Sequence, residues 1–368
     1  MKKLLLTTAF FSVLFLAKAQ TVTTFTEGTP DDAIAVDASG NIYCSNYVGD
    51  TVFKFTPTGE MTPFITGLNT PNGLAFNDNQ ELFVCDGQGN TIYKYDLDGN
   101  EIASYSAPGH PSGIVKSFDD DSMIFTLYQG NEIKRLAADG TITDVSLASE
   151  LNGPVGIVYD DNGNLFIGNY NNRAIYKVEE NGDLTYVAQL PTEGGTYPNL
   201  GFITYGDGKL WGTVMGNHEI FTINPQGVDD YTLFAGSDQG GEDGDISNAT
   251  FNIPNGIYYD KNSDNLLVTD FGSKNLRIIS GIVLSTSELK KNDIAILPNP
   301  AKDYFSIETN SEEFLSVKLS VFNALGVLVY QNDNVSAHQQ IDVSSWAKGH
   351  YFVKIQNESG TFFKQIVH

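Results

Sequence analysis

The sequence predicts an all-β protein, a six-bladed β-propeller followed by a small β-sandwich (Ig-like) C-terminal domain. Two observations lead to this prediction. A pattern of four short strands recurs six times through the middle of the chain, and after Leu297 it gives way to a different rhythm of strands and turns. The 368 residues include 36 glycines and only 18% charged residues, which is typical of a folded, turn-rich chain.

The first residues have the features of a secretory signal peptide. Two lysines precede an apolar run over residues 4–16, and residues 17–19, Ala-Lys-Ala, place small side chains where a signal peptidase cuts. We predict a signal peptide over residues 1–19 and no transmembrane segment in the mature chain. The alternative, a membrane anchor, needs about 20 apolar residues and different flanks.

The middle of the chain repeats with a period of about 40 residues. The first copy reads DDAIAVDASGNIYCSNYVGDTVFKF and the second PNGLAFNDNQELFVCDGQGNTIYKY. Apolar and polar residues alternate in runs bounded by Gly, Asn and Asp, which indicates strands. Spacings of 40, 40, 43, 45 and 55 residues separate the equivalent positions Ala33, Gly73, Gly113, Gly156, Gly201 and Gly256.

Four strands in each period are typical of a propeller blade. The sixth copy lacks its fourth strand, whereas residues 21–28, TVTTFTEG, form an extra strand before the first copy. We predict that this N-terminal strand completes blade six, because closing the ring removes an exposed sheet edge.

The repeats, with the loop FAGSDQGGEDGDISNATFNIPNGIYYD at residues 234–260, resemble NHL-type six-bladed propellers and, more distantly, the regucalcin and gluconolactonase propellers. The resemblance covers residues 21 to about 284 and implies the fold, but this fold serves binding proteins, lyases and lactonases alike. We place the propeller at residues 20–284 and a linker at residues 285–293.

The remaining residues, 294–368, have strands with turns every 8 to 12 residues, as in a β-sandwich. The segments Pro298-Asn299-Pro300, Leu325-Gly326-Val327 and Lys348-Gly349 resemble, in order, the type A C-terminal sorting domain of the type IX secretion system of Bacteroidota. The resemblance implies type IX machinery as a partner and a secreted or outer-membrane surface location. The alternative is an ordinary accessory β-sandwich.

The net charge, the cysteines and the catalytic motifs limit which partners, disulfides and reactions the sequence can support. With 21 Lys and Arg against 45 Asp and Glu, the net charge of −24 repels phosphate backbones and argues against nucleic acid as a partner. The two cysteines, Cys44 and Cys85, form no disulfide framework. Familiar catalytic motifs are absent from the sequence, and we expect the two propeller histidines, His110 and His218, to be exposed loop residues.

The strongest candidate site is the mouth of the central channel, reached by the residue before each innermost strand. Four of these residues carry side-chain oxygens suited to calcium, and adjacent blades supply them. They are Asp32, Asn72, Asn199 and Asn255. In regucalcin-like enzymes metal ligands occupy this position, which implies calcium here, but Ser112 and Val155 depart from the pattern. Asn before Gly is also a common turn residue.

Asn199 reaches the channel only if blade five carries a one-residue bulge, since otherwise Leu200 takes its place.

The sequence favours a binding module for an unknown extracellular ligand, carbohydrate or protein. The alternative is a calcium-dependent, gluconolactonase-like hydrolase of lactones or small esters. A lyase is a third reading, but no metal-binding set of histidines is visible. Whether the protein is an enzyme stays open.

Overall fold

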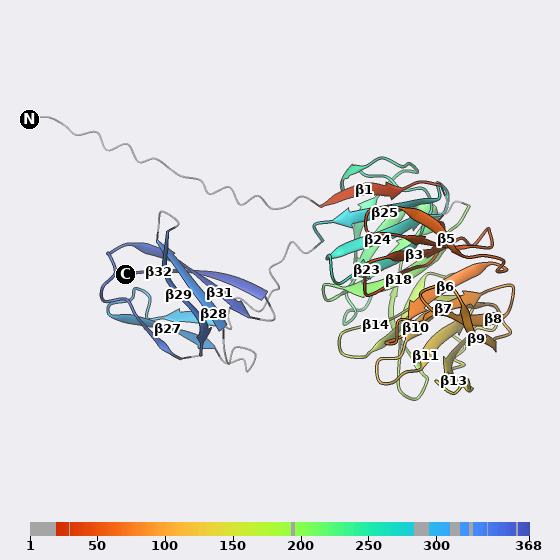
Figure 1. Cartoon of the computed structure of the whole chain (residues 1–368), viewed down its shortest axis with the longest axis horizontal. Coiled ribbons are helices and arrows are strands. Elements are labelled where there is room, and N and C mark those ends of the chain that lie inside the picture. The colour runs from red at the N-terminus through yellow and green to blue at the C-terminus, as the bar shows by residue number, and fades with distance from the viewer. Residues whose placement is uncertain are drawn as a thin grey trace, which may run out of the picture. The chain divides into compact units, whose positions relative to one another are not determined.

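The computed structural model describes residues 20–28, 30–192, 196–282, 294–309, 317–323, 327–336, 338–357 and 360–368. The chain divides into two compact units, Met1–Ile282 and Val283–His368 (Figure 1). The predicted signal peptide and linker lie outside the described residues. Within the described ranges, no helix is long and apolar enough to span a membrane.

Blades one to three are antiparallel sheets of four consecutive strands. Blade one contains β2 (Ile34–Val36), β3 (Ile42–Ser45), β4 (Val52–Phe55) and β5 (Met61–Ile65). Blade two contains β6 (Pro71–Phe76), β7 (Leu82–Asp86), β8 (Thr91–Tyr95) and β9 (Glu101–Ser106). Blade three contains β10 (Pro111–Lys116), β11 (Met123–Leu127), β12 (Glu132–Leu136) and β13 (Ile142–Ser146).

Blades four and five follow the same order. Blade four contains β14 (Pro154–Tyr159), β15 (Leu165–Asn169), β16 (Ala174–Val178) and β17 (Leu184–Gln189). Blade five contains β18 (Leu200–Gly206), β19 (Lys209–Val214), β20 (Glu219–Ile223) and β21 (Tyr231–Gly236), with a short 3-10 turn, η1 (Met215–Asn217).

Blade six joins the two ends of the propeller. It contains β23 (Pro254–Asp260), β24 (Asn265–Asp270), β25 (Asn275–Ser280), β1 (Thr21–Thr26) and the two-residue β22 (Gly244–Asp245). β1 pairs antiparallel with β25, and the hydroxyls of Thr21 and Ser280 are 2.9 Å apart. The prediction that the N-terminal strand completes blade six is confirmed.

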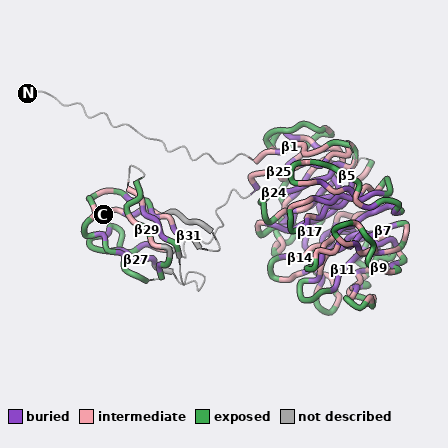
Figure 2. Tube along the Cα trace, in the orientation of Figure 1, coloured by how far each residue is buried: buried purple, intermediate pink, exposed green. Residues whose placement is uncertain are grey.

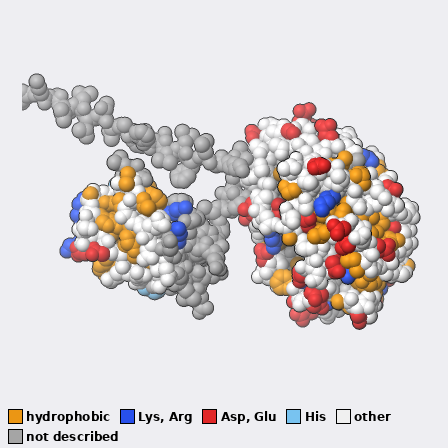
Figure 3. All heavy atoms as spheres, in the orientation of Figure 1, with side chains coloured by type: hydrophobic (Ala, Val, Ile, Leu, Met, Phe, Trp, Pro, Cys, Tyr) orange, Lys and Arg blue, Asp and Glu red, His pale blue; other side chains and the backbone are white. Residues whose placement is uncertain are grey.

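The ring is closed. The first strands of neighbouring blades contact one another in the order β2, β6, β10, β14, β18 and β23, and β23 contacts β2 again. Most residues of the first two strands of each blade are buried, whereas most residues of the fourth strands are exposed or half-buried (Figure 2). Acidic side chains are scattered over the visible face of the propeller (Figure 3). Cys44 and Cys85 are buried free thiols, as predicted.

Two glycines show why the repeat has Gly directly after the residue that faces the central channel. A Cβ at Gly73 would lie 2.0 Å from the carbonyl oxygen of Ser112. At Gly113 it would lie 1.8 Å from the carbonyl oxygen of Val155. Inner strands of adjacent blades therefore approach more closely than any side chain allows.

The long loop before β23 is fastened by a buried arginine. Arg277, on β25, donates to Asp270 at 3.1 Å and to Asp243 of the loop at 2.8 Å. Asp243 in turn accepts hydrogen bonds from the backbone and hydroxyl of Thr24, on β1. This carboxylate joins the loop to both strands that close the ring.

The C-terminal unit is the predicted small β-domain. One sheet contains β26 (Ile294–Leu297), β27 (Tyr304–Thr309) and β30 (Gln340–Asp342). The other contains β29 (Leu328–Val335), β28 (Val317–Asn323), β31 (His350–Asn357) and β32 (Gly360–Val367). Phe305 of the first sheet and Val353 of the second belong to one buried cluster, so the two sheets share a core.

Candidate functional site

The central channel holds two cavities, one at each end of the innermost strands. The first, which we call the aromatic cavity, has a volume of about 310 Å³. Its lining consists of Asp32, Tyr47, Asn72, His110, Ser112, Tyr128, Val155, Tyr170, Tyr197, Phe202, Met215, Asn255 and Phe271. All six blades contribute to it.

Three of the four predicted metal ligands meet here. Asp32, Asn72 and Asn255 line the aromatic cavity, and each is more than nine-tenths buried. Asn199 is not part of the lining, and its side-chain amide donates to the backbone carbonyl of Tyr170 at 3.3 Å. The placement of Asn199 in the channel was wrong.

Blade five supplies Phe202 instead. β18 starts with Leu200 opposite Val214, and the register shifts before Ile203. Leu200 is fully buried against blade four, where a Cβ at Gly168 would lie 2.7 Å from its side chain. Apolar burial therefore places Leu200 between the blades, and Phe202 lines the channel.

The floor of the aromatic cavity is a partly satisfied polar cluster. Asn255 Nδ2 donates to Asp32 Oδ1 at 2.6 Å, and Asn72 Nδ2 donates to Ser112 Oγ at 3.3 Å. Asp32 Oδ2 and Asn72 Oδ1 are buried, and the protein offers neither a hydrogen-bond partner. A buried acceptor without a donor costs free energy, so both oxygens favour a bound group.

Burial and the neighbouring carboxylate of Asp31 raise the pKa of Asp32 well above its usual value. Asp31 has its own cation, since Lys274 Nζ lies 3.5 Å from its carboxylate. The cluster of Asp32, Asn72 and Asn255 can thus accept hydrogen bonds, hold a cation or exchange a proton.

Aromatic side chains form the wall above this floor. Tyr47, Tyr128, Tyr170 and Phe271 follow the second strands of blades one, three, four and six at equivalent positions. The rings of Tyr128 and Tyr170 are 5.8 Å apart, as are those of Tyr197 and Phe271. Burial raises the pKa of Tyr170, which keeps its phenol neutral. This wall was not predicted from the sequence. The signal for it was an aromatic residue that recurs at the same position after the second strand of four blades.

Blade two has Gly87 at the equivalent position, and His110 fills the space. A Cβ at Gly87 would lie 2.6 Å from His110 Nε2. His110 is buried, and its ring lies 6.3 Å from Tyr47 and 5.7 Å from Tyr128. The expectation that His110 is exposed was therefore wrong. Burial lowers its pKa, which favours a neutral imidazole in the wall.

His218 lies outside the aromatic cavity. Its Nδ1 accepts a hydrogen bond from the backbone amide of Ile253 at 3.0 Å, and burial lowers its pKa. This side chain is half-buried and supports the loop that enters β23. The sequence predicted an exposed loop residue, and the side chain is less exposed than expected.

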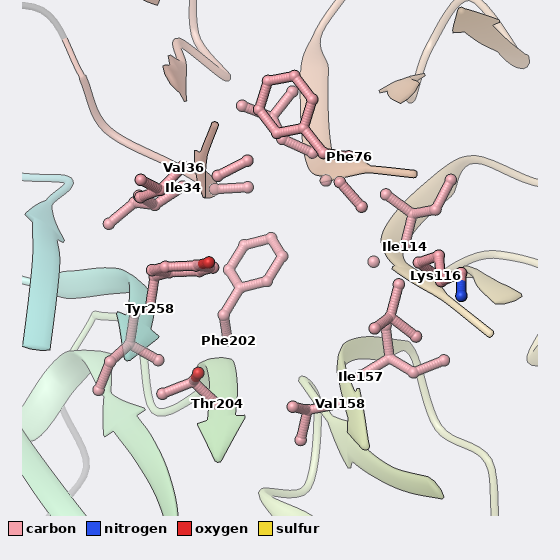
Figure 4. A pocket seen from close by; sticks show the side chains of 18 of the residues that line it. Ile34, Val36, Phe76, Ile114, Lys116, Ile157, Val158, Phe202, Thr204 and Tyr258 are labelled. Atoms are coloured by element: carbon pink, nitrogen blue, oxygen red, sulfur yellow. The ribbon is translucent and has the colours of Figure 1, made fainter. Parts of the chain in front are cut away.

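The second cavity, which we call the aliphatic cavity, has a volume of about 460 Å³ and opens at the other end of the inner strands. Val36, Phe76, Val158 and Tyr258 surround it (Figure 4). Its lysine, Lys116, is paired with Asp78 at 2.7 Å. Phe202 lines both cavities and lies between them. The polar residues Asn77 and Gln80 also line the aliphatic cavity.

The comparisons with known proteins agree with this architecture. The family model described as the virginiamycin B lyase family matches residues 12–240, and the model of the secretion system C-terminal sorting domain matches residues 295–368. The second match agrees with the predicted sorting domain. The first names a different propeller family from the NHL type, which stays a prediction.

One curated relative is the pentonolactonase XacC of Haloferax volcanii, 27% identical over 126 residues, which are 30% of this chain and 42% of that protein. The chain thus spans less than half of the relative's length. An auxiliary nutrient binding protein from Bacteroides ovatus is 17% identical, with 71% of this chain and 76% of that chain covered and a TM-score of 0.60.

A gluconolactonase from Xanthomonas campestris is 16% identical, with 73% of this chain and 93% of that chain covered and a TM-score of 0.53. At these identities the structural neighbours show the fold alone. The family model, in contrast, covers more than half of the sequence. The chain therefore belongs to the virginiamycin B lyase family and ends in a secretion system C-terminal sorting domain.

Proposed function

We propose that this protein is an exported ligand-binding module that holds a small organic molecule in the aromatic cavity. The sorting domain supports export through type IX machinery to the cell surface or the medium. A cavity of about 310 Å³ accommodates a small molecule such as a sugar, not a folded protein. Carbohydrates and other small extracellular metabolites are thus the ligand class that we favour over a protein partner.

The observation that carries the proposal is the pair of buried oxygens without donors, Asp32 Oδ2 and Asn72 Oδ1. They lie in the lining of a cavity whose wall is aromatic. A few convergent polar groups within an apolar, aromatic lining are typical of ligand sites. Structural neighbours named as nutrient-binding and as gluconolactonase proteins share the fold, so the site itself must decide between these activities.

The test is a thermal-shift screen of the purified mature chain against sugars, lactones, amino acids and amines. We expect a ligand to raise the melting temperature. The Tyr170→Ala variant should need at least tenfold more ligand for the same rise. Tyr186→Ala, on the exposed fourth strand of blade four, is the matched control and should bind normally. Binding that survives Tyr170→Ala unchanged would place the ligand elsewhere.

A second candidate function is that of a calcium-dependent lactonase. Asp32, Asn72 and Asn255 bring one carboxylate and two amides together, which are oxygen donors that suit calcium. Described residues offer no group of three His, Cys, Asp or Glu for a metal, so amides and water would complete the coordination. Bound there, calcium would polarise the carbonyl of a lactone. The partial match to a pentonolactonase favours this substrate class.

Calcium titration tests this candidate separately. A channel metal should raise the melting temperature of the wild-type chain, and Asp32→Ala should abolish the rise. Hydrolysis of pentono- and gluconolactones, followed by acid release, should then require calcium. If calcium leaves the melting temperature unchanged, the lactonase candidate fails, whereas the binding proposal stands.

A further inference from the structure

The aromatic cavity holds a buried carboxyl group without a counter-ion. Asp32 is the carboxylate in its lining, and the lining residues that the structure describes include neither Lys nor Arg. The neighbouring Asp31 is paired with Lys274, but no cation is paired with Asp32 among the lining residues, and its Oδ2 has no hydrogen-bond partner. An amide hydrogen bond does not neutralise a carboxylate, so the site is complementary to a ligand that brings a positive charge.

The wall of the cavity also suits a cation. Tyrosine and phenylalanine rings attract organic cations through the negative potential of their faces, and this attraction grows where water is excluded. Tyr47, Tyr128, Tyr170 and Phe271 bring such rings from four blades to one cavity. His110 is buried in the same wall, and its lowered pKa means that it adds no competing positive charge.

We infer that the ligand is a small organic ammonium ion, with its charge against Asp32 and its alkyl groups against the tyrosine rings. This inference rests on the proposed binding function and names its ligand class. A neutral sugar would satisfy the orphan oxygens but leave the carboxylate without a counter-charge. A calcium ion would supply the charge but make no use of the aromatic wall. The net charge of −24 also favours the approach of cations over anions.

The test compares a cation with its neutral isostere. Choline and 3,3-dimethyl-1-butanol have the same shape, but a carbon atom replaces the charged nitrogen in the alcohol. We expect calorimetry at constant ionic strength to give at least tenfold tighter binding of choline. Tetramethylammonium, which lacks the hydroxyl, should also bind.

Two variants assign the effect to the site. Asp32→Asn keeps the shape and the hydrogen bond from Asn255, so it should fold normally and weaken choline binding at least tenfold. Asp98→Asn removes one exposed carboxylate from a turn of blade two and should bind choline as the wild type does. Tyr170→Leu keeps an apolar side chain but removes the ring, and it should also weaken choline.

Three outcomes would overturn the inference. Equal binding of choline and the alcohol would show that charge is not recognised, and the ligand-binding function would stand without it. Choline binding that Asp32→Asn leaves unchanged would place the cation elsewhere. Absence of binding by both ammonium probes would exclude this ligand class, whereas the proposed function falls only if the wider small-molecule screen also fails.

Discussion

Asp32 is a residue whose ionisation the fold opposes. It is 3% exposed, lies next to Asp31 and has one oxygen without a partner. Selection for stability alone would favour an uncharged side chain here, because a buried carboxylate without a counter-ion lowers the free energy of unfolding. Such conflicts between local stability and sequence occur mostly at functional sites.

We predict that Asp32→Asn stabilises the ligand-free protein at neutral pH. The folded-state pKa of Asp32 is raised, so its contribution to stability is complete below the unfolded pKa of about 4 and is lost as the pH rises through the folded value. The variant should therefore melt several degrees higher than wild type at pH 7, with no gain near pH 3. Melting curves from pH 3 to pH 8 test this. Asp98→Asn should show no such pH-dependent gain, and a gain at pH 3 equal to that at pH 7 would contradict the assignment.

The candidate site was predictable where it follows the repeat. Asp32, Asn72 and Asn255 precede inner strands at equivalent positions, so alignment of the copies found them. Phe202 was not predictable, because it lines the channel only where Leu200 is buried against the neighbouring blade, which the sequence does not show. His110 was missed because the space it fills is created by Gly87, on a different blade.

At the scale of elements, the third strand of blade six depends on Arg277. This side chain is fully buried and contacts Asp270, Asp243 and the ring of Phe251. Burial raises the pKa of Asp270 to about 6 even with the arginine beside it. The ion pairs thus hold together the sheet in which the first and last strands of the propeller meet.

We predict that Arg277→Met destabilises the propeller by about 3–5 kcal/mol, because it leaves Asp270 buried without a counter-ion. Urea unfolding at pH 7 measures the loss. Lys261→Met is the matched control, since it removes an exposed ion pair with Asp161 and should cost less than about 1 kcal/mol. Similar losses for both variants would show that the buried ion pair stabilises the propeller no more than the exposed pair does.

The strands themselves were largely predictable, because each copy repeats the same alternation and the same turn residues. The glycine after the channel residue of blades two, three, four and six marks the close approach of inner strands, as Gly73 and Gly113 show. The role of the acidic loop was not predictable. Asp243 of this loop is bound to Arg277 and Thr24, which are distant in sequence.

At the scale of the molecule, a family propeller and a sorting domain form separate compact units. Each has its own buried core, and no residue of the C-terminal core cluster belongs to the described propeller clusters. The proposed binding site and the sorting domain therefore lie in different parts of the chain.

We predict that a chain lacking residues 292–368 folds but stays in the periplasm. The propeller has its own core, so its melting temperature after purification should match that of the propeller in the full chain. Cell fractionation and surface protease accessibility measure the location, with the full chain as the control. Delivery of the shortened chain to the surface or medium at the full chain's level would refute the sorting role.

Because β1 closes the ring, blade six can form only after the other blades have been made. Thr21 and Ser280 meet across 259 residues of sequence, so the strand that enters the export path first must wait for a partner near the end of the propeller. Blades one to five consist of consecutive strands and can form while the chain is still emerging. Blade six cannot. Until β25 arrives, the propeller is an open arc with an unpaired edge, and the pairing of β1 with β25 ends this state.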